Sequence, residues 1–310
     1  MTLASIVIPS RGGAGRLPTL LDALAAQDDP AWEAIVVLDG DIDDSAGVVA
    51  AYEQELPVRS IVFPENRGRV AALNAGFEAA RGEVLIRCDD DLVPAPDFVR
   101  RHKQALAEHP GGAIGLYLNR LPDTPYARAY GRAADGNFRR EAYAASPQTA
   151  WRYWAGNCST TRTLWSRVGP YDPDFRAYGW EDVDWGYRLH RLGVPVRLVP
   201  ELETPHHVAA TSTASRVLRA FHSGAARRIF EAKHGGVLAS AVPPLDSVWN
   251  AAVRITARVA GRSALRTAAR LIDSAARWLP LPVSRKAIAL LVESAALAGH
   301  RRPHQTTTEI

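Results

Sequence analysis

Two groups of carboxylates in this sequence have the types and spacing that chemistry requires. The first is the run Asp89-Asp90-Asp91, which closes the apolar segment 83–88 and is followed by Leu92-Val93-Pro94-Ala95-Pro96. The prolines cannot continue a helix, so the run is predicted to end a strand. Side chains two apart on a strand point the same way, so Asp89 and Asp91 are expected to converge on one divalent cation. The alternative is a solvated acidic turn before the segment that begins at Asp97.

The second group is Glu181-Asp182, within Gly179-Trp180-Glu181-Asp182-Val183-Asp184-Trp185. It opens a predicted helix, where unpaired backbone donors favour anions, so we expect Asp182 to stay ionised. A carboxylate fixed at the floor of a cleft can accept a proton from a hydroxyl nucleophile, which is general-base chemistry. In the alternative, Glu181, Asp182 and Asp184 only cap the helix and pair with Arg188.

The elements that must position these carboxylates are short apolar runs separated by helical stretches such as Leu17–Gln27 and Arg69–Ala80. The predicted strands are Ala4–Pro9, Ala34–Asp39, Val58–Phe63 and Val84–Asp89. This alternation predicts βαβ units and a mostly parallel sheet, with ligands at the carboxyl ends of its strands. The glycine-rich segment 11–15 has neither a GxGxxG pattern nor the lysine of a P-loop, so a dinucleotide or ATP site is weakly supported.

Length and composition indicate a globular protein of 310 residues with 47% hydrophobic content, enough for one α/β core plus an appendage. The two cysteines, Cys88 and Cys158, suggest neither a disulfide framework nor a zinc site, which fits a reducing cytoplasm. No charged leader precedes the first apolar run, and no uncharged run has the length of a membrane span. We therefore expect a cytoplasmic protein, and we expect no nucleic-acid partner for a net charge of only +4.

Taken together and in order, these motifs resemble the family 2 glycosyltransferases with the GT-A fold, over roughly residues 3–210. The matching segments are Ile6-Val7-Ile8-Pro9, Val36-Val37-Leu38-Asp39-Gly40, Asn66-Arg67-Gly68-Arg69 with Ala72, Asn74 and Gly76, the DXD-like Asp89-Asp90-Asp91, and the ED-like Gly179–Asp182. One departure is Gly40-Asp41-Ile42-Asp43-Asp44-Ser45, which differs from the usual D-G-S-x-D, so the contacts of that loop are left open.

The resemblance implies a mostly parallel sheet flanked by helices, and an inverting, Mn²⁺- or Mg²⁺-dependent transfer of a sugar. The donor would be a sugar linked to UDP, GDP or dTDP, and the acceptor a hydroxyl of a glycan, a lipid-linked molecule or a small molecule. Asp182 would be the general base. Acceptor binding would fall to Glu181, Trp180 and Trp154. Donor binding would fall to Pro9, Arg11, Asp39, Arg69, Asp89 and Asp90. The metal would be held by Asp91, Asp89 and His206.

Several of these assignments have alternatives. His206 ranks above His207 as a metal ligand, and both can instead be loop histidines. Trp154 can be a sugar platform or a core residue with equal weight. A nucleotidyltransferase would use similar metal carboxylates but would not need the Glu181-Asp182 pair. A non-catalytic module that binds sugar nucleotides, or a scaffold, would need no base.

The domain prediction is a catalytic region 1–210, with a donor half of about 1–115 and an acceptor half of about 116–210, then a helical region 211–299 and a disordered tail 300–310. In the helical region, arginine recurs every fourth residue at Arg254, Arg258, Arg262, Arg266 and Arg270. One hypothesis is docking on an anionic membrane surface, at the inner face, near a lipid-linked acceptor. The competing interpretations are a contact with a partner or an oligomer, and a solvated face of helices packed on the catalytic region.

Overall fold

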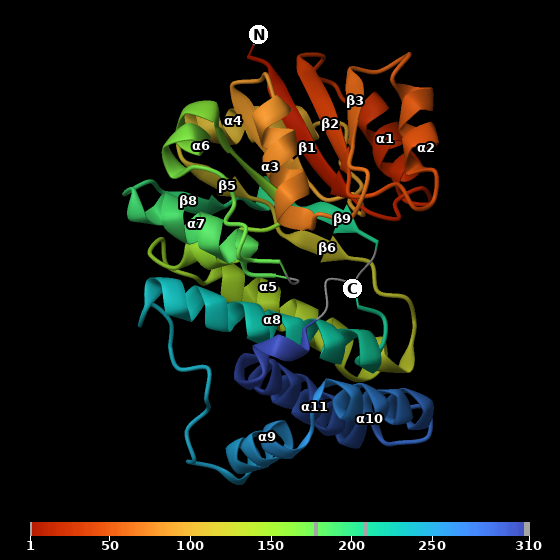
Figure 1. The fold of residues 1–310 in the computed structure, drawn as a ribbon, viewed down its shortest axis with the longest axis vertical. Helices are drawn as coiled ribbons and strands as arrows, with labels where there is room; N and C mark the ends of the chain where they lie inside the picture. Colours follow the sequence, from red (N-terminus) through yellow and green to blue (C-terminus); the bar gives the residue numbers. More distant parts are fainter. Residues whose placement is uncertain (1, 177–178, 208–209, 307–310) are drawn as a thin grey trace. The chain divides into compact units, whose positions relative to one another are not determined.

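The structure is a computed structural model that describes residues 2–176, 179–207 and 210–306, and these fall into two compact units (Figure 1). The first unit contains the chain up to Arg120, Arg139–Pro173 and Glu181–His207. The second contains Leu121–Phe138, Asp174–Trp180 and the described residues from 210 onward.

A seven-stranded sheet forms the centre of the first unit, in the order β3-β2-β1-β4-β7-β5-β8. Its strands are β1 (Ala4–Ser10), β2 (Trp32–Leu38), β3 (Val58–Val62), β4 (Val84–Cys88), β5 (Gly112–Ile114), β7 (Asn157–Thr161) and β8 (Val196–Leu198). Strand β7 is antiparallel to β4 and β5, and the other neighbours are parallel. The predicted mostly parallel sheet is therefore confirmed.

Helices cover both faces of this sheet, as the continuous buried runs of its strands require. They are α1 (Leu17–Ala25), α2 (Ser45–Tyr52), α3 (Arg69–Ala79), α4 (Phe98–Glu108), α6 (Arg162–Val168) and α7 (Glu181–Arg191). Every residue of β1 is buried. Ile6 and Ile8 belong to the same core cluster as the leucines of α1, whereas Val7 points to the other face and meets α3 at Gly76.

A small parallel sheet brings a distant segment beside the acidic run. It consists of β6 (Tyr117–Asn119) and β9 (Thr204–His206). His206 also forms an antiparallel bridge with Leu92, and the Val93 amide donates to the Pro205 carbonyl at 2.9 Å. Backbone pairing thus fixes the segment around His206 next to the residues that follow β4. A 3-10 turn, η3 (Pro200–Leu202), leads into β9.

The second unit is helical and has its own core. Between β6 and β7 the second unit takes the π-helix η1 (Ala127–Gly131) and the first half of α5 (Arg132–Tyr143), whereas α5 from Arg139 onward and the 3-10 turn η2 (Ala150–Tyr153) belong to the first unit. The C-terminal elements are α8 (Thr213–His234), α9 (Val248–Val259), α10 (Arg262–Ala275), α11 (Leu281–Arg301) and the 3-10 turn η4 (Pro303–Gln305). Helices α8 and α11 cross closely, because a Cβ atom on Gly299 would lie 1.8 Å from the Phe221 carbonyl oxygen. The predicted C-terminal helical region is confirmed.

Two boundaries differ from those expected. Residues 121–138 and 174–180 group with the C-terminal helices, although the sequence suggested a single break near 210. The expected tail also begins later than His300, because α11 continues to Arg301 and η4 follows it; residues 307–310 lie outside the described residues. In the described part of the chain, no helix combines the length and the apolar character needed to span a bilayer.

Candidate active site

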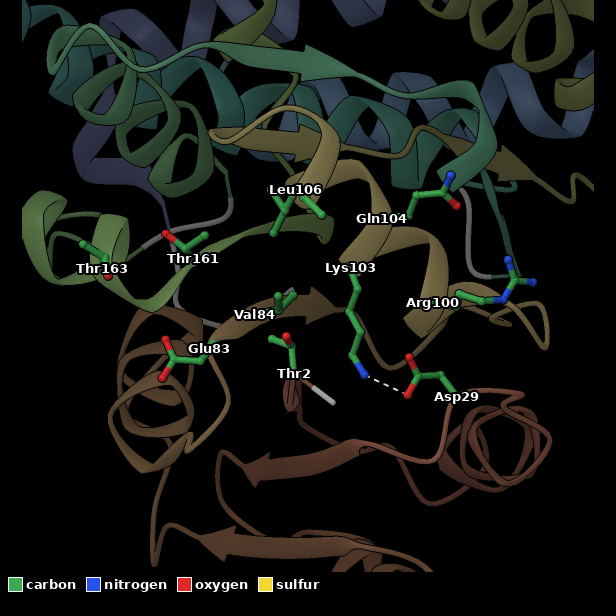
Figure 2. Close-up of a pocket in the computed structure, with 11 residues that line it drawn as sticks. Thr2, Asp29, Glu83, Val84, Arg100, Lys103, Gln104, Leu106, Thr161 and Thr163 are labelled. Atoms are coloured by element: carbon green, nitrogen blue, oxygen red, sulfur yellow. Dashed lines mark hydrogen bonds and ion pairs between the residues drawn. The ribbon is translucent and has the colours of Figure 1, made fainter.

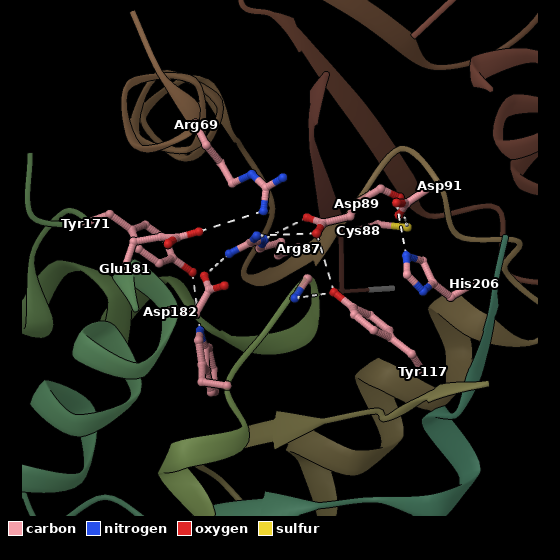
Figure 3. Close-up of polar contacts among 12 residues, drawn as sticks. Arg69, Arg87, Cys88, Asp89, Asp91, Tyr117, Tyr171, Glu181, Asp182 and His206 are labelled. Atoms are coloured by element: carbon pink, nitrogen blue, oxygen red, sulfur yellow. Dashed lines mark hydrogen bonds and ion pairs between the residues drawn. The ribbon is translucent and has the colours of Figure 1, made fainter. Parts of the chain in front are cut away.

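The two acidic motifs of the sequence are joined by a buried arginine. Arg87, on β4, is 1% exposed, and its Nε donates to Asp89 Oδ1 at 3.0 Å. Its other arm donates to Asp182 Oδ1 at the start of α7 (Figure 3). A guanidinium presents several donors in a fixed fork, so one side chain can hold two carboxylates. The carboxyl end of β4 and the start of α7 therefore meet in one charged network.

Burial sets the protonation of this network. Desolvation raises the pKa of Asp182 to about 8; the Arg87 charge opposes the shift, and the charges of Glu181 and Asp89 add to it. Burial also favours the neutral form of Asp89, but the guanidinium groups of Arg87 and Arg69 outweigh it and lower the pKa of Asp89. Burial thus acts against the effect of the helix start, on which the expectation of an ionised Asp182 rests, and that expectation stays a prediction.

Glu181 is a buried carboxylate that lacks hydrogen-bond partners. It is 2% exposed, and neither side-chain oxygen accepts a hydrogen bond from any described residue. Its nearest cation is Arg69, whose Nη1 lies 3.9 Å from Oε1. A desolvated carboxylate without donors is costly, so this position fits a group that receives hydroxyl donors from a ligand.

The backbone that leads into Glu181 is in an unusual conformation. Gly179 has φ +92° and Trp180 has φ +70°. A bulky residue in the left-handed region is uncommon and is found preferentially at functional sites. Trp180 belongs to the second unit, where its indole N–H donates to Ser223 Oγ at 3.0 Å. Its predicted role in acceptor binding stays a prediction.

Asp91 faces His206 at the other side of the acidic run. His206 Nε2 lies 3.0 Å from Asp91 Oδ2, and Nδ1 lies 2.6 Å from Asn119 Oδ1. Both ring nitrogens therefore lie against polar side chains, and Nε2 and Asp91 Oδ2 are close enough to serve as ligands of one cation. His207, by contrast, is exposed, and only its backbone amide contacts Asp91. The structure turns His206 inward, as the ranking of the two histidines anticipated.

These residues fit a divalent metal that is bound by few protein groups. Asp91 Oδ1 is buried without a hydrogen-bond partner, which leaves a carboxylate oxygen available to an ion. Among the residues described, no set of three or more His, Cys, Asp or Glu is arranged to hold a metal. A carboxylate and an imidazole suit Mn²⁺, and Mg²⁺ is commonly held by one or two protein carboxylates plus substrate phosphates and water.

Asp89 does not converge with Asp91. Its Oδ2 lies 3.4 Å from the Tyr117 hydroxyl, and the Gly156 amide donates to that hydroxyl at 2.8 Å. Gly156 is needed there, because a Cβ atom would lie 2.1 Å from the Asp89 carboxyl group. The strand ends at Cys88 and a turn follows, so the alternation expected for a strand does not extend to Asp91. The metal role of Asp89 stays a prediction.

On the donor side, Asp90 pairs with residues from the end of β1 and the start of α1. Its Oδ2 accepts from Ser10 Oγ at 2.5 Å and from Arg16 at 2.7 Å. Burial raises the pKa of Asp90, and the Arg16 partner opposes that rise. These contacts hold the glycine-rich loop against the acidic run.

Asp39, at the end of β2, is also engaged with backbone. Its carboxylate accepts from the amides of Arg67 at 2.6 Å and Gly68 at 2.9 Å, and Arg11 donates to its carbonyl oxygen at 2.7 Å. Pro9 is buried within β1. The carboxyl ends of β1, β2 and β4 thus bring the predicted donor residues to one edge of the sheet, while their roles toward a nucleotide stay predictions.

Trp154 is a core residue in this structure. It is 3% exposed, packs on Trp185 with ring centroids 4.9 Å apart, and donates from its indole nitrogen to the Tyr171 hydroxyl at 3.3 Å. A ring enclosed in this way cannot present a face to a sugar. The prediction that Trp154 binds the acceptor is therefore contradicted here, because aromatic packing beneath α7 takes up the ring.

Sequence reasoning missed four residues of this site: Arg87, Tyr117, Asn119 and Arg16. Arg87 left a signal, because a charged residue stands within an otherwise apolar strand whose five positions are all buried. Tyr117 packs on the His206 ring at 4.7 Å through β6–β9 pairing. No local pattern in the sequence predicts the pairing of β6 with β9.

A pocket of about 630 Å³ lies at the opposite ends of the strands. Its lining includes Val84 at the start of β4 and Thr161 at the end of the antiparallel β7, and Lys103 pairs there with Asp29 at 2.8 Å (Figure 2). It contains none of the predicted site residues. The candidate active site is therefore the charged network of Arg87, the acidic run and Asp182, and not this pocket.

Comparisons with known proteins agree with this geometry. The family model described as glycosyl transferase family 2 matches residues 5–164, just over half of the chain. The validoxylamine A glucosyltransferase of Streptomyces hygroscopicus subsp. jinggangensis is 29% identical over 251 residues, covering 70% of this chain and 58% of that protein. An undecaprenyl-phosphate 4-deoxy-4-formamido-L-arabinose transferase of Pseudomonas fluorescens is 36% identical over 129 residues, covering 40% of this chain and 38% of that protein. The chain thus spans less than two thirds of the length of these relatives.

Solved structures support the same fold. The mannosyltransferase PcManGT from Pyrobaculum calidifontis, in complex with GDP-Man and Mn²⁺, superposes with a TM-score of 0.64 at 20% identity, covering 96% of this chain and 87% of that one. TarS 1-349 of S. aureus in complex with UDP-GlcNAc gives 0.54 at 13% identity, covering 98% and 92%. The fold is that of the GT-A glycosyltransferases. From the match over residues 5–164, the chain belongs to glycosyl transferase family 2.

Proposed function

We propose that this protein is an inverting glycosyltransferase that moves a sugar from a nucleoside diphosphate to an acceptor hydroxyl, with Asp182 as general base. The observation that carries the proposal is the contact of Arg87 with both Asp89 and Asp182. In-line displacement needs the base on the face of the sugar opposite the departing diphosphate. A single guanidinium between the acidic run and α7 supports such an arrangement, with the chemistry in the first unit.

On the donor side, Asp91 and His206 would hold Mn²⁺ or Mg²⁺. When bound, the ion would neutralise charge that develops on the departing diphosphate. Arg11, Asp39, Arg69, Asp89, Asp90 and Pro9 are the proposed donor contacts. Support comes from two proteins of similar fold, one in complex with GDP-Man and Mn²⁺ and one with UDP-GlcNAc. The donor nucleotide here is accordingly UDP, GDP or dTDP.

On the acceptor side, Asp182 would take the proton of the attacking hydroxyl. A base is most effective when its pKa lies near the working pH, and burial raises the pKa of Asp182 to about 8. Arg87 would hold the carboxylate in position and stabilise its charged form. Glu181, which is buried and lacks donors, would accept hydrogen bonds from acceptor hydroxyls.

The test is a donor panel assayed with Mn²⁺ and with chelator, using simple sugars, a short-chain polyprenyl phosphate and small polyols as acceptors. We expect one nucleotide to support transfer only with metal, and NMR of the first-formed product to show inversion at the anomeric carbon. Retention of configuration would overturn the proposed mechanism. No transfer from any donor by folded protein, together with no release of nucleoside diphosphate, would count against the activity itself.

A further inference from the structure

The second unit leaves an unusual amount of apolar surface uncovered. Between Leu245 and Val283, nine large apolar side chains are at least 37% exposed. They are Leu245, Val248, Ile255, Val259, Leu271, Trp278, Leu279, Leu281 and Val283. Isolated exposed apolar residues are ordinary, but a concentration in one stretch marks an interaction surface.

Helix α9 has two apolar faces. Val253 and Ala257 are buried and lie in the core cluster of the second unit that includes residues of α11. Val248, Ile255 and Val259 follow a spacing of seven and four residues, which places them on one stripe, and they are 89%, 64% and 78% exposed. Figure 1 shows α9 beside α11 on the side away from α8. The helix therefore uses one apolar face for its fold and presents another.

The turn between α10 and α11 presents a second group of exposed apolar side chains. Trp278 is 78% exposed, and the Arg277 guanidinium lies 5.1 Å above its ring. Leu279, Leu281 and Val283 follow within five residues and are all exposed. An indole has an apolar body and one polar N–H, so it is favoured where hydrocarbon meets water.

The charge of the same stretch is strongly positive. Residues 245–290 contain eight Arg or Lys and two Asp. Both aspartates are used within the unit: Asp246 accepts from the Asn250 side chain at 2.7 Å, and Asp273 accepts from the amides of Thr213 and Ala214 at the start of α8. On α10, Arg266 and Arg270 are exposed, whereas Leu265 and Ala269 are buried. The arginines therefore face outward.

We infer that α9 and the turn between α10 and α11 dock on an anionic lipid surface. Exposed apolar stripes flanked by arginine are the pattern by which a helix lies in the interface of a bilayer. Anionic headgroups complement the arginines and supply the negative charge that the stretch itself lacks. A second copy of this chain would bring like charges together and offers no unengaged aspartate from this stretch, so a lipid surface fits better than self-association.

The inference is independent of the proposed reaction, because binding to vesicles is measured without donor or acceptor. Full-length protein would be sedimented with phosphatidylcholine vesicles that contain either one third phosphatidylglycerol or none. We expect binding to the anionic vesicles that falls steeply between 50 mM and 500 mM salt, and at least tenfold weaker binding to neutral ones.

Two variants divide the surface into its charged and apolar parts. The double reversal R266E/R270E should weaken binding to anionic vesicles by about tenfold or more, and I255S/V259S should weaken binding to a similar degree at low salt. The matched control is R81E/R167E, which reverses two exposed arginines of the first unit and should bind as wild type. Far-UV circular dichroism and thermal unfolding would verify that each variant is folded.

The fluorescence of Trp278 reports contact with lipid tails, which attraction between surface charges alone would not produce. Brominated lipid tails should quench part of the tryptophan fluorescence of wild type, and Trp278→Phe should remove that part while binding persists. Equal binding by all variants, or quenching that Trp278→Phe leaves unchanged, would overturn the inference. The inference would also be overturned if wild type stayed in the supernatant and sedimentation velocity showed a dimer. In that case I255S/V259S would be monomeric, because the apolar stripe would form the dimer contact.

Discussion

The first unit places charged groups where water is excluded, whereas the second places apolar groups where water has access. Arg87 and Glu181 are no more than 2% exposed, yet Val248 and Trp278 are 89% and 78% exposed. Each arrangement costs free energy for an isolated protein, because folding normally does the reverse. A buried charge network is explained by chemistry on a ligand, and an exposed apolar face by a partner that covers it.

The two units also differ in how they accommodate a buried histidine. His102, on α4 in the first unit, has both ring nitrogens in contact with oxygens, Ser159 Oγ at 2.8 Å and Asn157 Oδ1 at 3.2 Å. His222, on α8 in the second unit, is fully buried, and neither ring nitrogen has a hydrogen-bond partner among the described residues. His102 is therefore matched by polar partners on both ring nitrogens, whereas His222 is enclosed without them.

The largest effect is expected for Asp182→Asn, which removes the proposed base with almost no change of shape. We expect kcat to fall by about 10²–10⁴-fold while the affinity for the donor nucleotide changes little. Asp184→Asn is the matched control on the same helix, because Asp184 pairs with Arg188 outside the Arg87 network. Steady-state kinetics of both variants measure this. Transfer at the wild-type rate by Asp182→Asn would remove the base from the mechanism.

Arg87→Met should test whether the network depends on its buried guanidinium. Loss of the guanidinium leaves the half-buried Asp89 and Asp182 carboxylates without their partner, so we expect the free energy of unfolding at pH 8 to fall by about 3–5 kcal/mol. Without Arg87 both pKa values rise, so the deficit should shrink as the pH falls and the carboxylates become neutral. Urea unfolding at pH 8 and pH 5 measures both values. Arg87→Lys, which keeps the charge, is the control and should lose less.

The pH dependence of the rate should report the raised pKa of Asp182. A base acts when deprotonated, so kcat/KM should rise with pH to a plateau, with the midpoint of the rise at about pH 8. Well below that midpoint it should fall about tenfold per pH unit. Initial rates between pH 5 and 10 at saturating Mn²⁺ would measure the profile. A midpoint near 4 would mean that Arg87 keeps Asp182 ionised, and burial would then not control the site.

The smallest effect is expected from the two histidines. His102→Leu removes the imidazole partner of Ser159 Oγ and of Asn157 Oδ1, so it should lower the free energy of unfolding at pH 8 by about 1–3 kcal/mol. His222→Leu replaces an unpaired polar ring with an apolar group and should be neutral or stabilising. Urea denaturation of the two variants compares them directly. An equal loss of stability in both variants would mean that His222 is stabilised as well by its surroundings as His102.

The sequence predicted what local patterns determine. Apolar runs located the first four strands to within two residues, and the acidic run fell at the end of β4 as expected. The choice of His206 over His207 agrees with the inward ring, since β9 pairing directs it toward Asp91. Fold class and family followed from the order of five motifs.

What the sequence did not predict depends on contacts between distant segments. Arg87 contacts Asp182, a residue 95 positions away, and neither strand nor helix periodicity encodes that contact. Trp154 was assigned to the acceptor because residue type does not separate a platform from a core ring. The convergence of Asp89 and Asp91 failed because the strand stops at Cys88 and a turn separates the two carboxylates.

Calorimetric titration is the decisive experiment for a metal-dependent donor site built on Asp91. UDP, GDP and dTDP would each be titrated into wild type, Asp91→Asn and the control Asp97→Asn, whose carboxylate pairs with Arg101 at 2.6 Å. Each titration would be made with Mn²⁺ and with chelator. We predict that one nucleotide binds wild type and Asp97→Asn only with Mn²⁺, and does not bind Asp91→Asn. Binding that is equal with chelator and in Asp91→Asn, or no binding of any nucleotide by folded wild type, would contradict the claim.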